Sequence, residues 1–249
     1  MYMGRLFSIL SIMLLVAIQS SATGYDLTRK KAERFFSSGE WASASAMYEL
    51  MLAERPIVSS TYGHAIVSAS LRADTLDQMR LLEQAMHHSI PFDSIMESVH
   101  KVSLGCAHIQ AYEKFLLLAK KEYPWLGRAI DRYLLDYYAS RHNGAMMVHY
   151  SSLILNGLPD DINYLSLLAK GYMADNDISA ATAVYNRIIQ LDPDNYDALL
   201  AIGNYSYDIS QNCSDPETIR KEMSRARTCL QHAYTLKPTP FVAQLLKNL

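Results

Sequence analysis

The sequence is poor in glycine and proline, and neither sign of charge is in excess. Its 249 residues include 10 glycines and 8 prolines, which argues against a loop-rich β protein. Lysine and arginine together number 23, and aspartate and glutamate 25, so there is no basic excess to bind a phosphate backbone. We therefore expect no nucleic-acid partner. Hydrophobic residues make up 50% of the chain, which is enough to form a buried core.

Motifs for catalysis, cofactors and metals are also missing. There is no glycine-rich phosphate loop, no nucleophile elbow and no His-Glu-x-x-His sequence. The 8 histidines show no metal-ligand spacing; His87 and His88, for example, are adjacent and must point to different faces of a helix. The sequence therefore predicts no catalytic residues, no cofactor and no metal site, and it indicates a protein that is not an enzyme.

Cysteine is scarce, with 3 residues in the chain: Cys106, Cys213 and Cys229. In an exported protein an odd number leaves at least one thiol unpaired. A disulfide between Cys213 and Cys229 requires the intervening segment to bring the two Cα atoms within about 7 Å. The sequence favours buried free thiols but leaves this disulfide open.

The first residues have the layout of a secretory signal peptide, residues 1–22. Arg5 supplies a positive charge, Leu6–Ile18 is an apolar run of 13 residues that two serines interrupt, and small residues precede a cleavage position after Ala22. The run is short for a membrane span, which needs about 20 residues. We therefore expect an exported protein, periplasmic or secreted and belonging to a bacterial envelope, with no integral membrane span after cleavage. The alternative is an uncleaved N-terminal membrane anchor.

Prolines occur at nearly even intervals along the chain. The gaps between six of them are 35, 33, 35, 34 and 45 residues, and the last gap equals one repeat plus an insertion. A period near 34 residues is typical of arrays of helical hairpins. Because the residue before a proline avoids the α conformation, we expect each proline to end the second helix of a hairpin. These positions are Pro56, Pro91, Pro124, Pro159, Pro193 and Pro238.

The stretch 160–193 shows one repeat most clearly. Apolar residues in Ile162–Tyr172 recur at steps of three and four, so they line one face of a helix. Asp175–Asp177 predicts a turn, and Ser179 is the predicted N-cap of a second helix whose apolar stripe runs to Ile188. The pattern therefore predicts a helix–turn–helix hairpin.

Small and aromatic residues alternate within this hairpin. Ala169 and Ala181 allow the two helix axes to approach within about 8–10 Å, and Tyr172 and Tyr185 fill the remaining volume. This alternation, closed by Asp-Pro, resembles the tetratricopeptide repeat (TPR). The match is strong in the first, fifth and sixth units and loose between residues 59 and 127.

The resemblance implies an all-α fold, a TPR-like right-handed α-solenoid of about six helix–turn–helix repeats with a C-terminal capping helix. In the fourth unit Leu135 and Met147 occupy the places of small residues, which predicts more open packing there. Asp215 is the predicted N-cap of a lengthened helix at 216–235. The implied domain covers residues 25–249, with approximate repeats 25–58, 59–92, 93–127, 128–161, 162–195 and 196–240 and a capping helix at 240–249.

The resemblance also implies a binding surface, because TPR proteins usually bind peptides on the concave wall made by the first helix of each hairpin. That wall implies a protein or peptide partner in a groove of mixed charge, although the same charges are also typical of an ordinary solvated face. Lys170 and Asn204 match two places of the clamp that holds chaperone carboxylate tails, but the other clamp residues are absent, which disfavours that ligand. The implied groove residues are Arg29, Glu33, Glu97, Lys101, Arg132, Asp136, Ser166, Lys170, Met173, Leu200, Asn204 and Tyr207.

The function that the sequence favours is an exported, non-enzymatic TPR scaffold or adaptor for protein–protein interaction. One alternative is a self-associating structural component of the cell envelope, a homo-oligomer that stacks through Phe241 and neighbouring leucines. Another is a helical-array enzyme whose site has no recognisable motif. Tyrosine is abundant, and four residues are predicted to lie outside the packing stripe, either for recognition or for contacts between repeats. These are Tyr133, Tyr137, Tyr205 and Tyr207.

Overall fold

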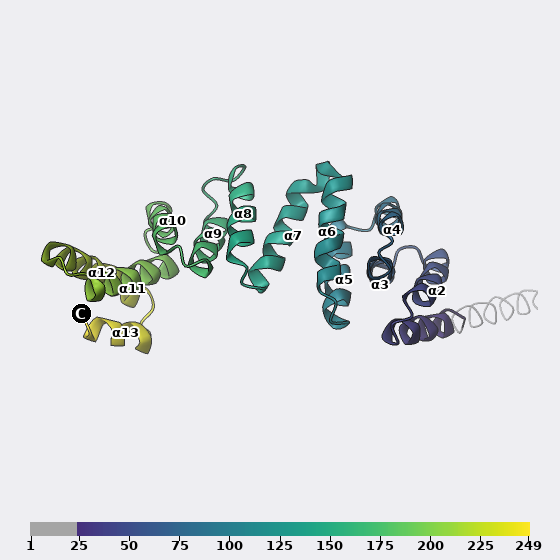
Figure 1. The fold of residues 1–249 in the computed structure, drawn as a ribbon, viewed down its shortest axis with the longest axis horizontal. Coiled ribbons are helices and arrows are strands. Elements are labelled where there is room, and N and C mark those ends of the chain that lie inside the picture. The colour runs from purple at the N-terminus through teal and green to yellow at the C-terminus, as the bar shows by residue number, and fades with distance from the viewer. Residues whose placement is uncertain (1–23) are drawn as a thin grey trace, which may run out of the picture. The chain divides into compact units, whose positions relative to one another are not determined.

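The computed structural model of the protein describes residues 24–249, and all regular secondary structure in that range is helical (Figure 1). The predicted signal peptide, 1–22, lies outside the described residues. The helices are the first segment at residues 24–37, α2 (Trp41–Glu54), α3 (Ser59–Leu71), α4 (Thr75–His87), α5 (Phe92–Gly105), α6 (Gln110–Glu122), the 3₁₀ turn η1 (Pro124–Leu126), α7 (Gly127–Ser140), α8 (Gly144–Leu155), α9 (Ile162–Ala174), α10 (Ile178–Leu191), α11 (Tyr196–Asn212), α12 (Pro216–Leu236) and α13 (Pro240–Lys247).

The chain forms two compact units, and we call the unit that ends at Gly127 unit 1 and the unit Arg128–Leu249 unit 2. In unit 1, α3 is central and packs against α2, α4 and α5. Tyr62 and Ile66 of α3 are fully buried there, as is Phe115 of α6. These large apolar side chains explain why hairpins with a loose sequence match still pack on one another.

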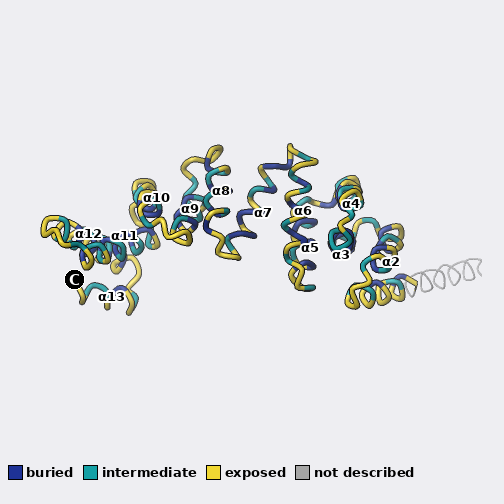
Figure 2. Tube along the Cα trace, in the orientation of Figure 1, coloured by how far each residue is buried: buried dark blue, intermediate teal, exposed yellow. Residues whose placement is uncertain are grey.

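In unit 2, each helix from α8 to α13 packs against the next one along the chain. One core of buried side chains extends from Leu155 at the end of α8 to Ile202 of α11. Ala169 and Ala181 are fully buried within it, as their predicted role in close helix approach requires. Figure 2 shows buried and exposed positions recurring along most helices of unit 2. Because their buried residues contact neighbouring helices, these helices depend on one another for stability.

The turn inside each of five hairpins contains a residue in the left-handed conformation. Gly39, Ala73, Ala107, His142 and Asn176 have φ between 52° and 78°, and successive positions are 34 or 35 residues apart. The following N–H closes the same six-residue ring in every turn and satisfies a carbonyl group that the helix end leaves without a partner. These bonds join Glu40 N to Phe35 O, Asp74 N to Ala69 O, His108 N to Ser103 O, Asn143 N to Tyr138 O and Asp177 N to Tyr172 O, at 2.9–3.1 Å.

The residue after the left-handed position often caps the second helix of the hairpin. The Asp74 carboxylate accepts a hydrogen bond from Asp77 N at 3.0 Å, and the Asp177 carboxylate accepts one from Ala180 N at 3.0 Å. The prediction of Ser179 as the cap of α10 is therefore wrong, since Ser179 already lies in the first turn of that helix. The left-handed turn determines where α10 begins. The side chain that accepts a hydrogen bond from the first turn of α10 is therefore that of Asp177.

The fourth hairpin does not pack openly, as its large residues had suggested. Leu135 is fully buried and Met147 is 4% exposed. The space comes from the next hairpin, where a Cβ at Gly171 of α9 would meet Met147 Cβ at 3.0 Å. The small residue thus lies on the neighbouring helix α9 instead of within the fourth hairpin, and the Met147 side chain fills the space that Gly171 leaves.

The last hairpin is longer than the others. The Asp215 carboxylate caps α12 by accepting a hydrogen bond from Thr218 N at 2.9 Å, which confirms the predicted cap. A Cβ at Gly203 would lie 2.6 Å from the Leu230 side chain, so glycine permits the close packing of α11 on α12. Beyond this hairpin, α13 packs on α12 and buries Val242 completely.

Among residues 24–249, no helix combines the length and the apolar character that crossing a membrane requires. All three cysteines are free thiols in the structure, so Cys213 and Cys229 form no disulfide there. Each thiol is partly exposed, and the expectation that the cysteines are buried is therefore wrong.

Candidate partner-binding surfaces

The twelve predicted groove residues lie on the first helix of their hairpins, and none is buried. In unit 1, Arg29 and Glu33 lie on residues 24–37, and Glu97 and Lys101 lie on α5. The others are in unit 2, on α7, α9 and α11. They are Arg132, Asp136, Ser166, Lys170, Met173, Leu200, Asn204 and Tyr207.

A hollow of about 480 Å³ in unit 2 brings three of these residues together. Met173, Leu200 and Asn204 share it with residues of α10 that sequence reasoning did not assign to the groove. We call it the unit 2 hollow. Its lining consists of Met173, Ile178, Thr182, Tyr185, Asp197, Leu200, Ala201, Asn204, Tyr205 and Asp208.

The wall that α10 contributes to this hollow is uncharged. Ile178 is the first residue of α10, placed there by the turn that precedes it. The Thr182 hydroxyl donates to Ile178 O at 2.8 Å, so its proton is already used within the helix. Burial raises the pKa of Tyr185, and the nearby charge of Asp197 raises it further, so this phenol stays neutral at physiological pH.

The face of α11 that lines the hollow carries polar groups beside Leu200 and Ala201. Asn204 is half-buried, and its carboxamide makes no hydrogen bond with the described residues. Asp197 and Asp208 are exposed, and neither carboxylate forms an ion pair within residues 24–249. No lysine or arginine lines the hollow, so its only formal charges are the two carboxylates. The hollow is therefore apolar inside with acidic ends.

A second hollow, of about 810 Å³, lies in unit 1 and has a different character. Lys101 is the predicted groove residue in its lining. Aromatic rings form one wall: the Trp41 ring is 5.9 Å from the ring of His108 and 5.1 Å from that of Phe36, centroid to centroid. Sequence reasoning missed this wall, because Trp41 and His108 come from different hairpins and only the fold brings them together.

His64 lies beside this aromatic wall, with its ring 5.2 Å from Phe36. Its Nδ1–H donates to Ser60 O at 2.8 Å. Burial lowers the pKa of His64, and this effect outweighs the hydrogen bond to Ser60 and the charge of Glu33, which both raise it. His64 is therefore a neutral ring at neutral pH, oriented by its backbone bond.

The remaining predicted residues line neither of these two hollows. Arg29 and Glu33 form an exposed pair at 3.7 Å. They line a small hollow together with Ser60 and His64, which also line the second hollow. Arg132 lines a smaller hollow of about 280 Å³ in unit 2 together with residues of α8. Lys170 is exposed on α9, one turn before Met173. Their assignment to a binding groove stays a prediction.

The four tyrosines expected outside the packing stripe have different surroundings. Tyr133 is half-buried, whereas Tyr137 is 3% exposed, which excludes the recognition role for Tyr137 and leaves the alternative of packing. Its ring packs edge-on against Tyr138 at 5.0 Å, since the core at α7 uses adjacent residues rather than one narrow stripe. Tyr205 lines the unit 2 hollow, and Tyr207 is half-buried on the same helix.

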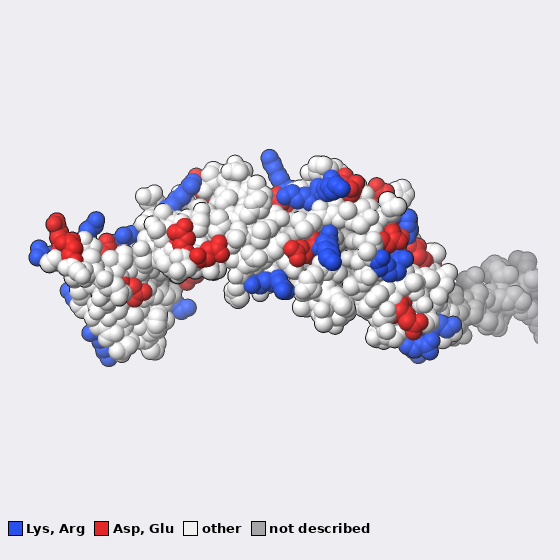
Figure 3. Space-filling view, viewed as in Figure 1, with Lys and Arg blue, Asp and Glu red and all other residues white. Residues whose placement is uncertain are grey.

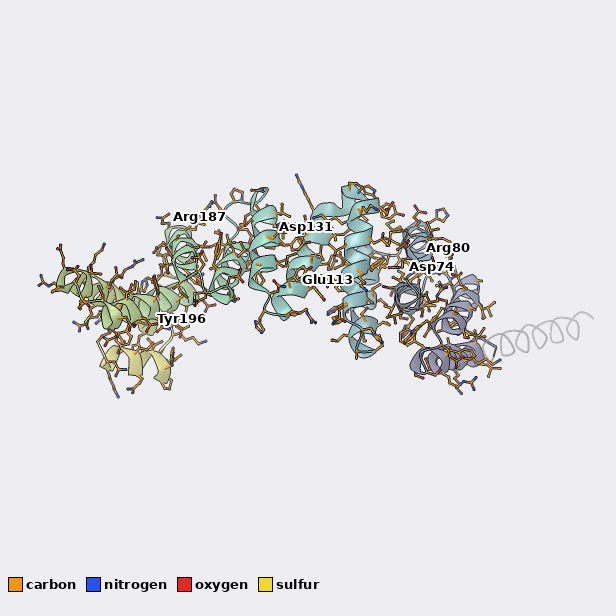
Figure 4. The ribbon with its side chains drawn as sticks, viewed as in Figure 1. Asp74, Arg80, Glu113, Asp131, Arg187 and Tyr196 are labelled. Carbon is orange, nitrogen blue, oxygen red and sulfur yellow. The ribbon has the colours of Figure 1, made fainter. Side chains whose placement is uncertain are left out.

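Charged side chains elsewhere serve structural contacts. Arg80, labelled in Figure 4, bonds the carboxylates of Asp77 and Glu49 and so joins α4 to α2. Arg187 pairs with Asp160 at 2.9 Å. On the face drawn in Figure 3, basic and acidic side chains are interspersed. In the part of the chain that the structure describes, no three His, Cys, Asp or Glu side chains gather as a metal site would require.

Comparisons with known proteins identify the fold. No protein-family model and no curated protein matches the chain. A crystal structure from Bacteroides ovatus, to which a protein-binding role is ascribed, matches at a TM-score of 0.54 and 14% identity, covering 77% of this chain and 95% of that one.

Two further structures match at lower TM-scores. The C-terminal part of a TPR repeat-containing protein from Cytophaga hutchinsonii has a TM-score of 0.41 and 12% identity, covering 87% of this chain and 98% of that one. The pilF protein of Pseudomonas aeruginosa has a TM-score of 0.46 and 12% identity, covering 91% and 98%. The Bacteroides structure shares the fold of this chain, and the repeated turns described above agree with it.

The protein is thus an all-α, TPR-like array of helical hairpins. Identities of this size show the fold alone, so function must be argued from the surfaces of this chain.

Proposed function

We propose that the protein is a non-enzymatic scaffold or adaptor that binds a protein or peptide partner. The observation that carries this proposal is the unit 2 hollow, where Met173, Leu200 and Asn204 meet between successive hairpins. An apolar cavity with a few polar groups at its edge is the usual form of a binding site. A hairpin array supplies such a surface on rigid helices, which limits the conformational cost of binding.

We propose further that the protein acts outside the cytoplasm. The support is the signal-peptide layout of residues 1–22. N-terminal sequencing of the protein recovered from its native compartment tests this, and cleavage after Ala22 would leave Thr23 as the first residue. An intact N-terminus on a membrane-bound protein would instead favour the uncleaved anchor.

The binding proposal is tested by one substitution inside the hollow and one outside it. Leu200→Arg places a charge on the apolar wall, whereas Leu76→Arg alters a leucine of α4 that is 84% exposed. Both variants are first compared with the wild type by circular dichroism and thermal melting. Proteins that the immobilised full chain retains from an extract of the producing cells are then identified by mass spectrometry.

We expect the wild type and Leu76→Arg to retain the same partner and Leu200→Arg to lose it. If a folded Leu200→Arg variant retains the same proteins as the wild type, the hollow is not the binding surface and the proposal is wrong. Combined Arg132→Glu and Lys170→Glu changes test the remaining predicted groove residues in the same assay.

Self-association is a second candidate, favoured by one observation. Phe241 of α13 is 57% exposed although Val242 beside it is fully buried. An exposed aromatic ring on a terminal helix is able to contact a second copy. Light scattering over a range of concentrations decides this, because a constant monomer mass would exclude a homo-oligomer.

A further inference from the structure

We propose that the unit 2 hollow binds an extended peptide segment in which one large apolar side chain lies between two lysine or arginine residues. This inference rests on the proposed function, since it names the partner chemistry for the same surface. It follows from the apolar wall, from one unpaired carboxamide and from the spacing of two carboxylates.

The apolar wall, which Met173 of α9 forms with Leu200 and Ala201 of α11, requires an apolar anchor on the partner. Leu200 and Ala201 are half-buried, and Met173 is 45% exposed, so their side chains contact solvent in the free protein. Covering this surface with one large side chain is favourable by the hydrophobic effect. A cavity of about 480 Å³ has room for such a side chain and for the adjoining backbone. The flexible Met173 side chain can adjust to its shape.

The Asn204 carboxamide indicates that the occupant is a peptide. It lies beside the apolar wall and has no hydrogen-bond partner among residues 24–249. A carboxamide offers an N–H donor and a C=O acceptor, the same pair of groups that a peptide unit presents. A purely hydrocarbon occupant would bury this amide without partners, which is costly. A peptide backbone satisfies it.

The two carboxylates set the charge and the spacing of the partner. Asp197 and Asp208 are both on α11 and both line the hollow. Eleven residues separate them, which is close to three helical turns, so they lie on one face about 16 Å apart along the helix axis. Asn204 lies between them on that face. Each end of the hollow therefore presents an unpaired negative charge.

An extended peptide matches this spacing. Side chains at i, i+2 and i+4 of an extended chain point to the same side and span about 13–14 Å. The length of a lysine or arginine side chain covers the remaining few ångströms. A segment of the form basic–x–apolar–x–basic thus places its anchor on the wall and one cation near each aspartate. An acidic segment would bring like charges together and is disfavoured.

The test uses three fluorescein-labelled peptides that share Gly-Ser flanks, and the full chain. Their central sequences are Lys-Ser-Phe-Ser-Lys, Glu-Ser-Phe-Ser-Glu and Lys-Ser-Ser-Ser-Lys, and binding is measured by fluorescence anisotropy. The variants are Asp197→Asn with Asp208→Asn, and Leu200→Arg. The matched control, Glu54→Gln with Glu217→Gln, removes two exposed carboxylates away from the hollow. Thermal melting confirms that each variant is folded.

We expect the wild type and the control to bind the Lys-Ser-Phe-Ser-Lys peptide about ten-fold more tightly than the glutamate peptide, since each exposed ion pair changes affinity by about three-fold. The preference should fall below about three-fold in the double aspartate variant, and in the wild type when NaCl rises from about 0.05 M to about 0.5 M. The peptide without phenylalanine should bind at least about ten-fold more weakly, because it lacks the anchor.

Equal binding of the lysine and glutamate peptides, or a preference that survives both aspartate changes, would overturn this inference. If Leu200→Arg abolishes retention of native partners while the basic peptide shows no preference, only the partner chemistry is wrong. If the basic peptide binds in an aspartate-dependent way while Leu200→Arg retains all native partners, the chemistry stands and the proposed function is wrong.

Discussion

Gly171 of α9 faces the backbone of Val148 in α8 at a distance where a side chain would require α8 to shift by a few tenths of an ångström. A Cβ at position 171 would lie 3.0 Å from Val148 N, and also 3.0 Å from Met147 Cβ. Backbone atoms of a helix cannot move aside without moving the helix. This contact therefore sets how closely the fourth and fifth hairpins approach each other.

Gly171→Ala should destabilise the protein. Overpacking costs about 1–3 kcal/mol, and the higher helix propensity of alanine returns up to about 1 kcal/mol, so we expect the free energy of unfolding to fall by about 1–2 kcal/mol. Urea denaturation measures it. Gly105→Ala is the matched control, because a Cβ there meets nothing within 4 Å. A Gly171→Ala variant as stable as this control would show that α8 and α9 are free to separate.

Replacing the left-handed alanines of the turns by glycine should raise the stability of the protein. Ala73 and Ala107 have φ of 58° and 62°, a conformation that costs an L-residue about 1–2 kcal/mol and glycine almost nothing. After the entropy that glycine adds to the unfolded chain is subtracted, we expect Ala73→Gly and Ala107→Gly each to stabilise the protein by about 0.5–1 kcal/mol.

The control for these turns is an alanine of ordinary helical conformation. Ala42→Gly on the exposed side of α2 should destabilise by about 1 kcal/mol. Differential scanning calorimetry of the three variants should show higher melting temperatures for the two turn variants and a lower one for Ala42→Gly. A lower melting temperature for both turn variants would contradict the left-handed assignment.

The capping of α10 can be tested at two neighbouring positions. Asp177→Ala removes the acceptor for Ala180 N and should lower the free energy of unfolding by about 1 kcal/mol. Ser179→Ala should change it by less than about 0.5 kcal/mol, because Ser179 does not act as the cap. Urea midpoints for both variants are the measurement, and a larger effect at Ser179 would reverse the assignment.

His64 should make stability depend on pH. Its folded pKa lies below the ordinary value of 6.5 because burial disfavours the imidazolium. As pH falls from about 7.5, the unfolded chain takes up a proton at His64 before the folded chain does, so the free energy of unfolding falls until the folded pKa is reached. His64→Gln removes this proton uptake.

As pH falls from about 7.5 to about 5, we therefore expect the free energy of unfolding of the wild type to fall relative to that of His64→Gln. Urea denaturation at several pH values measures this shift. Parallel pH profiles for the two proteins would mean that His64 has the same pKa in the folded and unfolded chains.

Helices and turns could be predicted because their causes are local. The prolines follow the second helix of each hairpin, and Asp215 caps α12, as the spacing and residue types indicated. The cap of α10 could not be chosen between Asp177 and Ser179 from composition alone. That choice depends on the left-handed residue Asn176, which decides where the helix begins.

Packing between hairpins was harder to predict, because one residue compensates for another at a distance. The large side chain of Met147 suggested an open fourth hairpin, yet Gly171 in the next hairpin accommodates it. Tyr137 was placed off the stripe because a single helical period does not anticipate two adjacent buried tyrosines.

The candidate site was also predictable only in part. Met173, Leu200 and Asn204 were predicted from repeat positions, and the fold brings them together. The α10 wall was missed in part because Tyr185 also belongs to the hairpin core, to which the sequence assigned it. Asp197 and Asp208 had no signal of their own in the sequence. Their importance appears only when one face of α11 is seen to line a hollow.

The left-handed turns recur every 34 or 35 residues from Gly39 to Asn176 and use the same backbone bond each time. A segment that runs from one such turn to the next contains the residues that end one helix and begin the following one. Duplication or deletion of a segment of this length would therefore join helices through the same kind of turn. An insertion within a hairpin, in contrast, needs its own residue to cap the helix that follows it, as Asp215 caps α12.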